Sequence, residues 1–137
     1  MTFGIHLKRV PPLGRLELEV LQYVWRVGAG DAKGVQQELH LQRAISLSTV
    51  QSTLDRLYRK QLLARGKVRH AYVYTPAVTR QDLITRMVAD VIGRLGGGNL
   101  NQALSGLIDL ADSADESTLS RLESMIAQRR NKAAQEN

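Results

Sequence analysis

Short polar side chains are concentrated in the segment SLSTVQSTLDRLYRK, which runs from Ser46 to Lys60. As a helix that turns about 100° per residue, this segment gathers its apolar side chains on one face and its polar side chains on the other. Hydroxyl and amide groups on short side chains open the polar face, so the helix backbone can approach a partner surface closely. The polar residues of interest are Ser48, Thr49, Gln51, Ser52 and Asp55.

These side chains have the chemistry that reads base edges in the major groove of DNA. Glutamine can pair with adenine through two hydrogen bonds, hydroxyl groups reach bases or phosphates, and a threonine methyl group can contact thymine. We therefore predict that Ser48, Thr49, Gln51, Ser52 and Asp55 read bases. For Asp55 the sequence leaves two partners open, a cytosine amine or Arg59 four residues further on.

Cationic side chains flank this polar face and are predicted to hold the phosphate backbone of the DNA. They are Arg56, Arg59, Lys60, Lys67 and Arg69. Residues 1–80 contain 13 Lys and Arg against 5 Asp and Glu, whereas residues 81–137 contain 6 against 8, so the excess positive charge lies in the first part of the chain. Arg56 has an open alternative, because its apolar stem could instead cover the surface of the domain.

The composition argues against an enzyme or a metalloprotein. The 137 residues include no cysteine, and His6, His40 and His70 lack the spacing of metal ligands. We therefore expect no catalytic residue, no metal and no cofactor. The apolar runs are shorter than the roughly 18 residues needed to cross a bilayer, and the first residues lack the pattern of a secretory signal. We expect a cytoplasmic protein without membrane insertion.

The polar face needs a scaffold, and the surrounding sequence predicts one. Apolar periodicity and β-prone runs predict helices at residues 14–26, 31–41 and from about 46 to 60, and strands at residues 62–65 and 71–75. Asp31 is the expected N-cap of the second helix, and either Ser46 or Ser48 can cap the third. Three helices followed by a hairpin with a cationic tip are the element order of a winged helix-turn-helix domain.

Three further helices with apolar faces are predicted after the hairpin. The first opens at Thr79, which has capping-box spacing to Asp82, the second covers about residues 100–110, and Ser113 with Glu116 caps the last. Such short helices bury too little surface to be stable alone, so we predict that they pair with a second copy of the chain. An alternative is that they fold back on the first domain. The predicted dimerisation residues are Leu83, Met87, Val88, Val91, Ile92, Leu95, Leu104, Leu107, Ile108, Leu119, Leu122 and Ile126.

The predicted fold is mainly α with a small β-hairpin. It consists of a winged helix-turn-helix domain followed by a C-terminal helical dimerisation domain. The predicted boundaries are an N-terminal tail at 1–12, the winged-helix domain at 13–78, the dimerisation domain at 79–128 and a polar tail at 129–137. The polar tail is expected to fray.

Several motifs together resemble the penicillinase repressor family, which includes the regulators of β-lactamase and methicillin resistance. They are TVQSTLDRLYRKQLL with HAYVYTP, EVLQYVW in the first helix, and NLNQALSGLIDLA after the glycine turn. The family pattern Thr-(Val/Ile)-x-Thr-x-Leu-x-Arg-Leu occurs here from Thr49 to Leu57, with Ser52 in place of a threonine. The resemblance extends from about Leu13 to Ile126.

The resemblance implies a homodimeric bacterial repressor that binds a palindromic operator, often with TACA and TGTA half-sites. It also implies control of β-lactam-resistance or related stress genes, and release when a membrane-bound sensor protease cuts the dimerisation helices. Well-known members carry an Asn-Phe bond at the cleavage position, whereas this chain carries Gly106-Leu107. A related copper-responsive branch uses C-terminal cysteines, which this chain lacks.

Two other binding functions remain as alternatives. A small-molecule-responsive winged-helix regulator would have a ligand pocket between its dimerisation helices, where Met87 and Met125 could lie. A winged-helix protein-interaction adaptor would carry an apolar patch on its third helix. The third helix predicted here is polar and flanked by arginines, which favours DNA.

Overall fold

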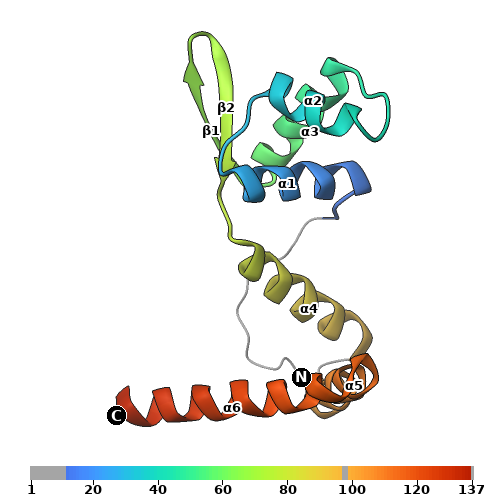
Figure 1. Cartoon of the computed structure of the whole chain (residues 1–137), viewed down its shortest axis with the longest axis vertical. Helices are drawn as coiled ribbons and strands as arrows, with labels where there is room; N and C mark the ends of the chain where they lie inside the picture. The colour runs from blue at the N-terminus through green and yellow to red at the C-terminus, as the bar shows by residue number, and fades with distance from the viewer. Residues whose placement is uncertain (1–11, 97–98, 137) are drawn as a thin grey trace. The chain divides into compact units, whose positions relative to one another are not determined.

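The computed structural model describes residues 12–96 and 99–136, so the predicted N-terminal tail lies, apart from Pro12, outside the described residues. The helices and strands in chain order are α1 (Arg15–Val27), α2 (Ala32–His40), α3 (Leu47–Arg59), β1 (Leu63–Val68), β2 (Ala71–Pro76), α4 (Arg80–Gly96), α5 (Leu100–Ala114) and α6 (Glu116–Glu136) (Figure 1). This order confirms the predicted mainly α fold with one β-hairpin. The chain divides into two units at Val88 and Ala89, within α4.

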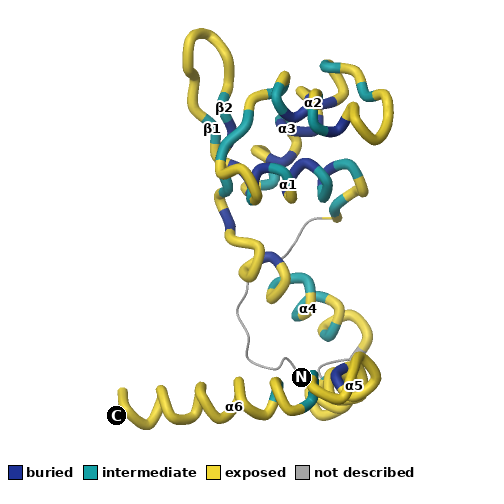
Figure 2. The backbone as a smooth tube through the Cα atoms, in the orientation of Figure 1, coloured by how far each residue is buried: buried dark blue, intermediate teal, exposed yellow. Residues whose placement is uncertain are grey.

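The first unit is built around an apolar core that α1, α2 and α3 share. Its fully buried side chains are Val20, Leu21, Val24, Val35, Val50, Leu54 and Leu57, and the buried stretches of the three helices are dark in Figure 2. Local signals set the helix ends, as predicted. Gly28 ends α1 in the left-handed region with φ 94°, and the Asp31 side chain caps α2 by accepting a hydrogen bond of 2.8 Å from the N–H of Gly34.

Helix α3 presents one face to this core and the opposite face to solvent. Ser46 is its N-cap and accepts a hydrogen bond from the N–H of Thr49, which decides between the two predicted caps. Thr53 is also fully buried, which the apolar pattern did not indicate. Its hydroxyl donates to the carbonyl oxygen of Thr49 at 2.8 Å, so its polar group has a partner in the core. A polar side chain is tolerated at such a position when its hydrogen bond is made within the helix.

Strands β1 and β2 form an antiparallel hairpin, the wing, in which Val68 pairs with Ala71. The turn therefore consists of Arg69 and His70 alone, and the residues from Gly66 to Val68, predicted to lie in the tip, belong to β1. Both turn residues have positive φ, 52° and 68°. The base of the wing is attached to the helices by an isolated bridge in which Gly30 and Tyr74 exchange backbone hydrogen bonds of 2.9 and 2.8 Å.

Helix α4 begins in the first unit. The Thr79 hydroxyl accepts a hydrogen bond of 3.0 Å from the N–H of Asp82, which is the predicted cap. Leu83 is only 2% exposed and Met87 is partly buried, and both pack in the core of the first unit. The prediction that Leu83 serves dimerisation is therefore corrected, whereas for Met87, which keeps an exposed part, it stays a prediction. Helical periodicity identifies an apolar face without identifying which core it joins.

Helices α5 and α6 of the second unit pack against each other. The prediction that Ser113 caps the last helix is wrong, because Ser113 lies inside α5 and its hydroxyl donates to the carbonyl oxygen of Leu110. Asp115 is the cap instead, and hydrogen bonds from Ser117 and Thr118 lower the pKa of its carboxyl group from 3.8 to about 2. Helix α6 continues to Glu136, through the segment predicted to fray.

The turn of the wing yields a prediction about stability. Two-residue hairpin loops with positive φ at both positions favour Asn-Gly, whereas Arg and His are disfavoured in the left-handed region. The double substitution Arg69→Asn/His70→Gly should raise the free energy of unfolding by about 1 kcal/mol in urea denaturation. Ala71→Gly, one residue along in β2, is the matched control and should lower it by about 0.5–1 kcal/mol. A destabilised double variant would contradict the strained turn.

Candidate nucleic-acid interface

The N-terminus of α3 carries a compact group of hydroxyls. The Ser46 Oγ lies 3.2 Å from the Ser48 Oγ and 2.8 Å from the Thr49 Oγ1, so the cap residue also orients its neighbours. Ser48, Thr49, Gln51 and Ser52 are all exposed, as the sequence predicted for a binding face. Free backbone N–H groups at a helix N-terminus add affinity for an anion such as a phosphate.

Gln51 also lines a pocket of about 480 Å³ between α3, the start of α2 and the inner side of the wing. The wall of this pocket combines charged, aromatic and apolar side chains. Its lining residues are Asp31, Ala32, Lys33, Leu47, Gln51, Leu54, Asp55, Arg65, His70, Ala71, Tyr72 and Tyr74. The arrangement makes a groove between helix and wing whose lining includes the exposed Lys33 and His70, which sequence reasoning did not select.

Asp55 is paired with two arginines. Its Oδ2 lies 3.0 Å from the Nε of Arg59, which is one of the two partners that the sequence left open, and its Oδ1 accepts a hydrogen bond of 2.9 Å from the Nη1 of Arg65. The carboxylate therefore has partners on α3 and on β1. Its negative charge on the polar face is compensated within the protein.

Arg65 is the central residue that the sequence analysis missed. Its guanidinium carbon lies 3.9 Å from the ring centroid of Tyr58 and 4.1 Å from that of Tyr72, so α3 and the wing both contact it through aromatic faces. Hydrogen bonds to Tyr74 and Asp55 raise the pKa of Arg65 above its ordinary value. The alternation of Leu63, Arg65 and Lys67 along β1 was the available signal, since alternate residues share one face of a strand.

The predicted phosphate-binding cations differ in their surroundings. Arg59 and Arg69 are exposed, and the Lys67 ammonium lies 5.3 Å from the ring centroid of Tyr72 on the wing. Arg56 is exposed and donates to the hydroxyl of the buried Thr53 at 3.1 Å. Lys60 is half-buried and already paired, because its ammonium lies 2.6 Å from the carboxylate of Glu17 and donates to the carbonyl oxygen of Pro12 at 2.8 Å.

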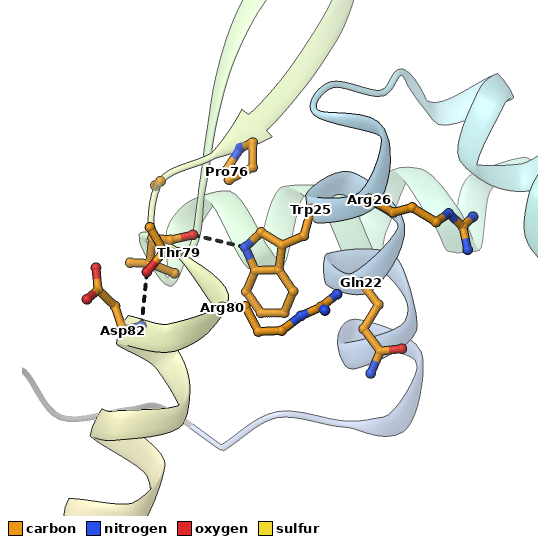
Figure 3. A pocket seen from close by; sticks show the side chains of 9 residues that line it. Gln22, Trp25, Arg26, Pro76, Thr79, Arg80 and Asp82 are labelled. Carbon is orange, nitrogen blue, oxygen red and sulfur yellow. Dashed lines mark hydrogen bonds between the residues drawn. The ribbon is translucent and has the colours of Figure 1, made fainter. Parts of the chain in front are cut away.

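A second pocket, of about 710 Å³, lies where the segment after β2 passes α1 (Figure 3). The Trp25 indole Nε1 donates to the carbonyl oxygen of Val78 at 2.9 Å, and the Arg80 guanidinium lies 5.4 Å from the Trp25 ring centroid. These contacts fix the start of α4 against α1. Trp25 therefore connects α1 of the winged-helix core to the first residues of α4.

Among the described residues, no group of His, Cys, Asp or Glu is large enough to hold a metal ion. No helix within residues 12–96 and 99–136 combines the length and the apolar character required to cross a bilayer. The side chains brought together here are suited to holding bases and phosphates.

The chain is similar to known repressors over most of its length. The sequence model of the penicillinase repressor family matches residues 13–128. The penicillinase repressor of Bacillus licheniformis is 28% identical over 103 residues, which cover 75% of this chain and 80% of that protein. The transcriptional regulator BlaI of Mycobacterium tuberculosis is 27% identical over 113 residues, which cover 80% of this chain and 82% of that protein. A solution structure of the DNA-binding domain of the repressor BlaI is 32% identical, covering 56% of this chain and 93% of that domain with a TM-score of 0.49.

The surroundings of Lys60 predict a structural role. Glu17 is 8% exposed, so removing its cation leaves a carboxylate with poor access to water. Lys60→Met should therefore lower the free energy of unfolding by about 1–3 kcal/mol, measured by urea denaturation at neutral pH. The matched control is Arg59→Met at the adjacent, exposed position, which should change it by less than about 0.5 kcal/mol. Equal effects of the two substitutions would refute the assignment.

Proposed function

The chain belongs to the penicillinase repressor family, and we propose that it acts as a homodimer that reads a palindromic operator in double-stranded DNA. Members of this family are DNA-binding transcriptional repressors and not enzymes. The observation that carries the proposal is the row of short hydroxyl and amide side chains exposed at the capped start of α3. The opposite face of α3 is buried in the core, so the helix fixes the direction in which this row of side chains faces solvent.

We propose that four side chains contact base edges: Ser48, Thr49, Gln51 and Ser52. Their side chains are short enough for the backbone of α3 to enter the major groove, where hydroxyls and a glutamine amide match base edges. Asp55 is a weaker candidate than its position suggests, because both of its oxygens already have arginine partners. Its role in this proposal is to arrange the charges of the binding face.

Phosphate binding falls to exposed cations on both sides of that row. Arg56 and Arg59 follow it along α3, and Lys67 and Arg69 extend along the wing. Each contact that neutralises a phosphate releases counterions, so affinity should fall steeply with salt concentration. Lys60 contributes to this surface indirectly, by anchoring the end of α3 through Glu17.

Dimerisation is supported by the apolar surface of the second unit. Ala111 is the one residue shown as buried among those of Ala89–Glu136 whose burial is described. A helical unit with so small a core needs a partner to be stable, and a second copy related by a twofold axis is the simplest one. Exposed or half-buried apolar residues available to it are Val88, the last residue of the first unit, and, in the second unit, Val91, Ile92, Leu95, Leu104, Leu107, Ile108, Leu119, Leu122 and Ile126.

The proposed regulation follows that of the relatives. We propose that the repressed genes serve β-lactam resistance or a related stress response, which selection of bound fragments from the source genome would test. Gly106-Leu107 aligns with the bond at which the family resemblance places cleavage by a membrane-bound sensor protease, but it lacks the Asn-Phe pair of well-known members. The bond lies in the interior of α5, so a protease that needs extended substrate would first have to unwind that helix.

Gln51 provides the test of base reading. Gln51→Ala should weaken binding to the preferred operator by about 1–3 kcal/mol and leave binding to random DNA nearly unchanged, because the lost contact is to a base edge. Fluorescence anisotropy at a fixed salt concentration measures both affinities. An equal loss on the two DNAs would refute base reading by Gln51.

Lys67→Ala is the matched control for that measurement. A phosphate contact carries no sequence information, so its loss should weaken binding to both DNAs alike. It should also reduce the slope of log affinity against log salt by about one unit.

Leu107 provides the test of the dimer. Leu107→Asp places a charge on the apolar face of α5 and should convert the protein to a monomer in sedimentation velocity at micromolar concentration. Operator affinity should fall by at least about tenfold, because the two half-sites are then bound independently. Leu41→Asp, at an 82% exposed position in the first unit, is the control and should stay dimeric. A dimeric Leu107 variant would locate the interface elsewhere.

A further inference from the structure

A carboxylate on a DNA-reading face presents an electrostatic problem. Asp55 lies on α3 one turn before Arg59, with its side chain 35% exposed. If α3 lies in the major groove, phosphates pass on both sides of it, and an uncompensated carboxylate there would repel them. The wing supplies a counter-ion for this carboxylate, Arg65 on β1.

The two arginine partners of Asp55 have different environments. The Arg65 side chain is 21% exposed and lies between the rings of Tyr58 and Tyr72, whereas the Arg59 side chain is 77% exposed. Arg65 is thus fixed by α3 and by both strands of the wing. Arg59 has one ion pair within the part of the chain that the structure describes, the contact of 3.0 Å between its Nε and Asp55, and its side chain is otherwise largely exposed.

We propose that Arg65 is a positioning residue that neutralises Asp55, so that Arg59 can leave Asp55 and bind a DNA phosphate. Before binding, Asp55 has both arginines and holds Arg59 along α3. On binding, Arg59 exchanges the carboxylate for a phosphate, and Asp55 keeps Arg65 as its partner. This inference rests on the proposed function, since the second partner of Arg59 is DNA.

Removal of Arg65 should therefore weaken DNA binding indirectly, through Asp55 and Arg59. Without Arg65, Asp55 has Arg59 as its remaining partner, and transfer of Arg59 to a phosphate would leave an unpaired carboxylate close to the DNA. Arg59 should then stay with Asp55. The protein would lose one phosphate contact and gain an uncompensated negative charge on its binding face.

The same contacts join the wing to α3. Asp55 and Tyr58 belong to α3, Arg65 to β1 and Tyr72 to β2. A purely mechanical role for Arg65 is therefore the main competing explanation. Neutralising Asp55 separates the two, because it removes the need for a counter-ion without restoring the link between wing and helix.

The experiment is a double-mutant cycle of Arg65→Met and Asp55→Asn on the full chain, with operator affinity and salt slope measured for each variant. Methionine keeps an unbranched stem between the two tyrosine rings and removes the charge. Arg65→Met should bind about tenfold more weakly, with a salt slope reduced by about one phosphate contact. Asp55→Asn alone should bind about threefold more tightly at low salt. The double variant should return to within about threefold of wild type and regain the slope.

Four results would overturn the inference. A double variant as weak as Arg65→Met with a reduced slope would mean that Arg65 itself contacts DNA. Equal weakness with a wild-type slope would mean that Arg65 only places the wing. An Arg65→Met variant as tight as wild type, or an Asp55→Asn variant weaker than wild type, would also contradict it.

Controls keep these results interpretable. Arg65→Lys retains the charge but not the planar group, so it should keep the wild-type salt slope, and it supplies the comparison if Arg65→Met is poorly folded. Circular dichroism reports folding of every variant. Wild-type protein that fails to prefer its operator would contradict the proposed function, whereas wild-type binding without rescue in the double variant would contradict the role of Arg65 alone.

Discussion

The binding surface depends on the burial of one face of α3. Val50, Leu54 and Leu57 are fully buried against α1 and α2, and Thr53 satisfies its hydroxyl within the helix so that it can join them. Because that face is fixed in the core, the hydroxyls and the amide on the opposite side have a defined direction. The Ser46 cap adds order at the end of the helix where the backbone would approach DNA most closely.

The cations of this surface differ in whether they are paired with a carboxylate of the protein. Lys60 stabilises the winged-helix core through Glu17, and Arg65 joins the wing to α3 through Asp55 and two tyrosines. Arg59, Lys67 and Arg69 remain exposed, which is what the proposed phosphate contacts require. A count of basic residues along the sequence cannot make this distinction, since it depends on partners far away in the chain.

Local signals predicted most of the first unit. The caps at Asp31 and Thr79 depend on residues three positions apart, and the element order follows from periodicity. Where several capping residues occur together, as in Ser113-Ala-Asp115, the sequence does not select between them, and Asp115 is the cap. The wing shows the limit for strands, because the pairing of Val68 with Ala71 leaves a turn of Arg69 and His70 that ordinary turn preferences disfavour.

Long-range packing accounts for the remaining differences. The apolar face of α4 was predicted as one surface, but Leu83 joins the core of the first unit while Val91 and Leu95 stay exposed. Arg65 was missed because its contacts are with Tyr58 and Tyr72, which the fold brings to it from α3 and from β2. Helical or strand periodicity indicates which side chains share a face, whereas the partner of that face is fixed by the tertiary structure.

The proposed function requires two chains that place a pair of α3 helices on an inverted repeat. Sedimentation equilibrium with a fluorescently labelled duplex tests it most directly, using inverted TACA and TGTA half-sites one helical turn apart and a scrambled duplex of equal length. We expect two chains on each inverted-repeat duplex and much weaker association with the scrambled one at the same salt concentration. One chain per duplex, or equal association with both duplexes, would contradict it.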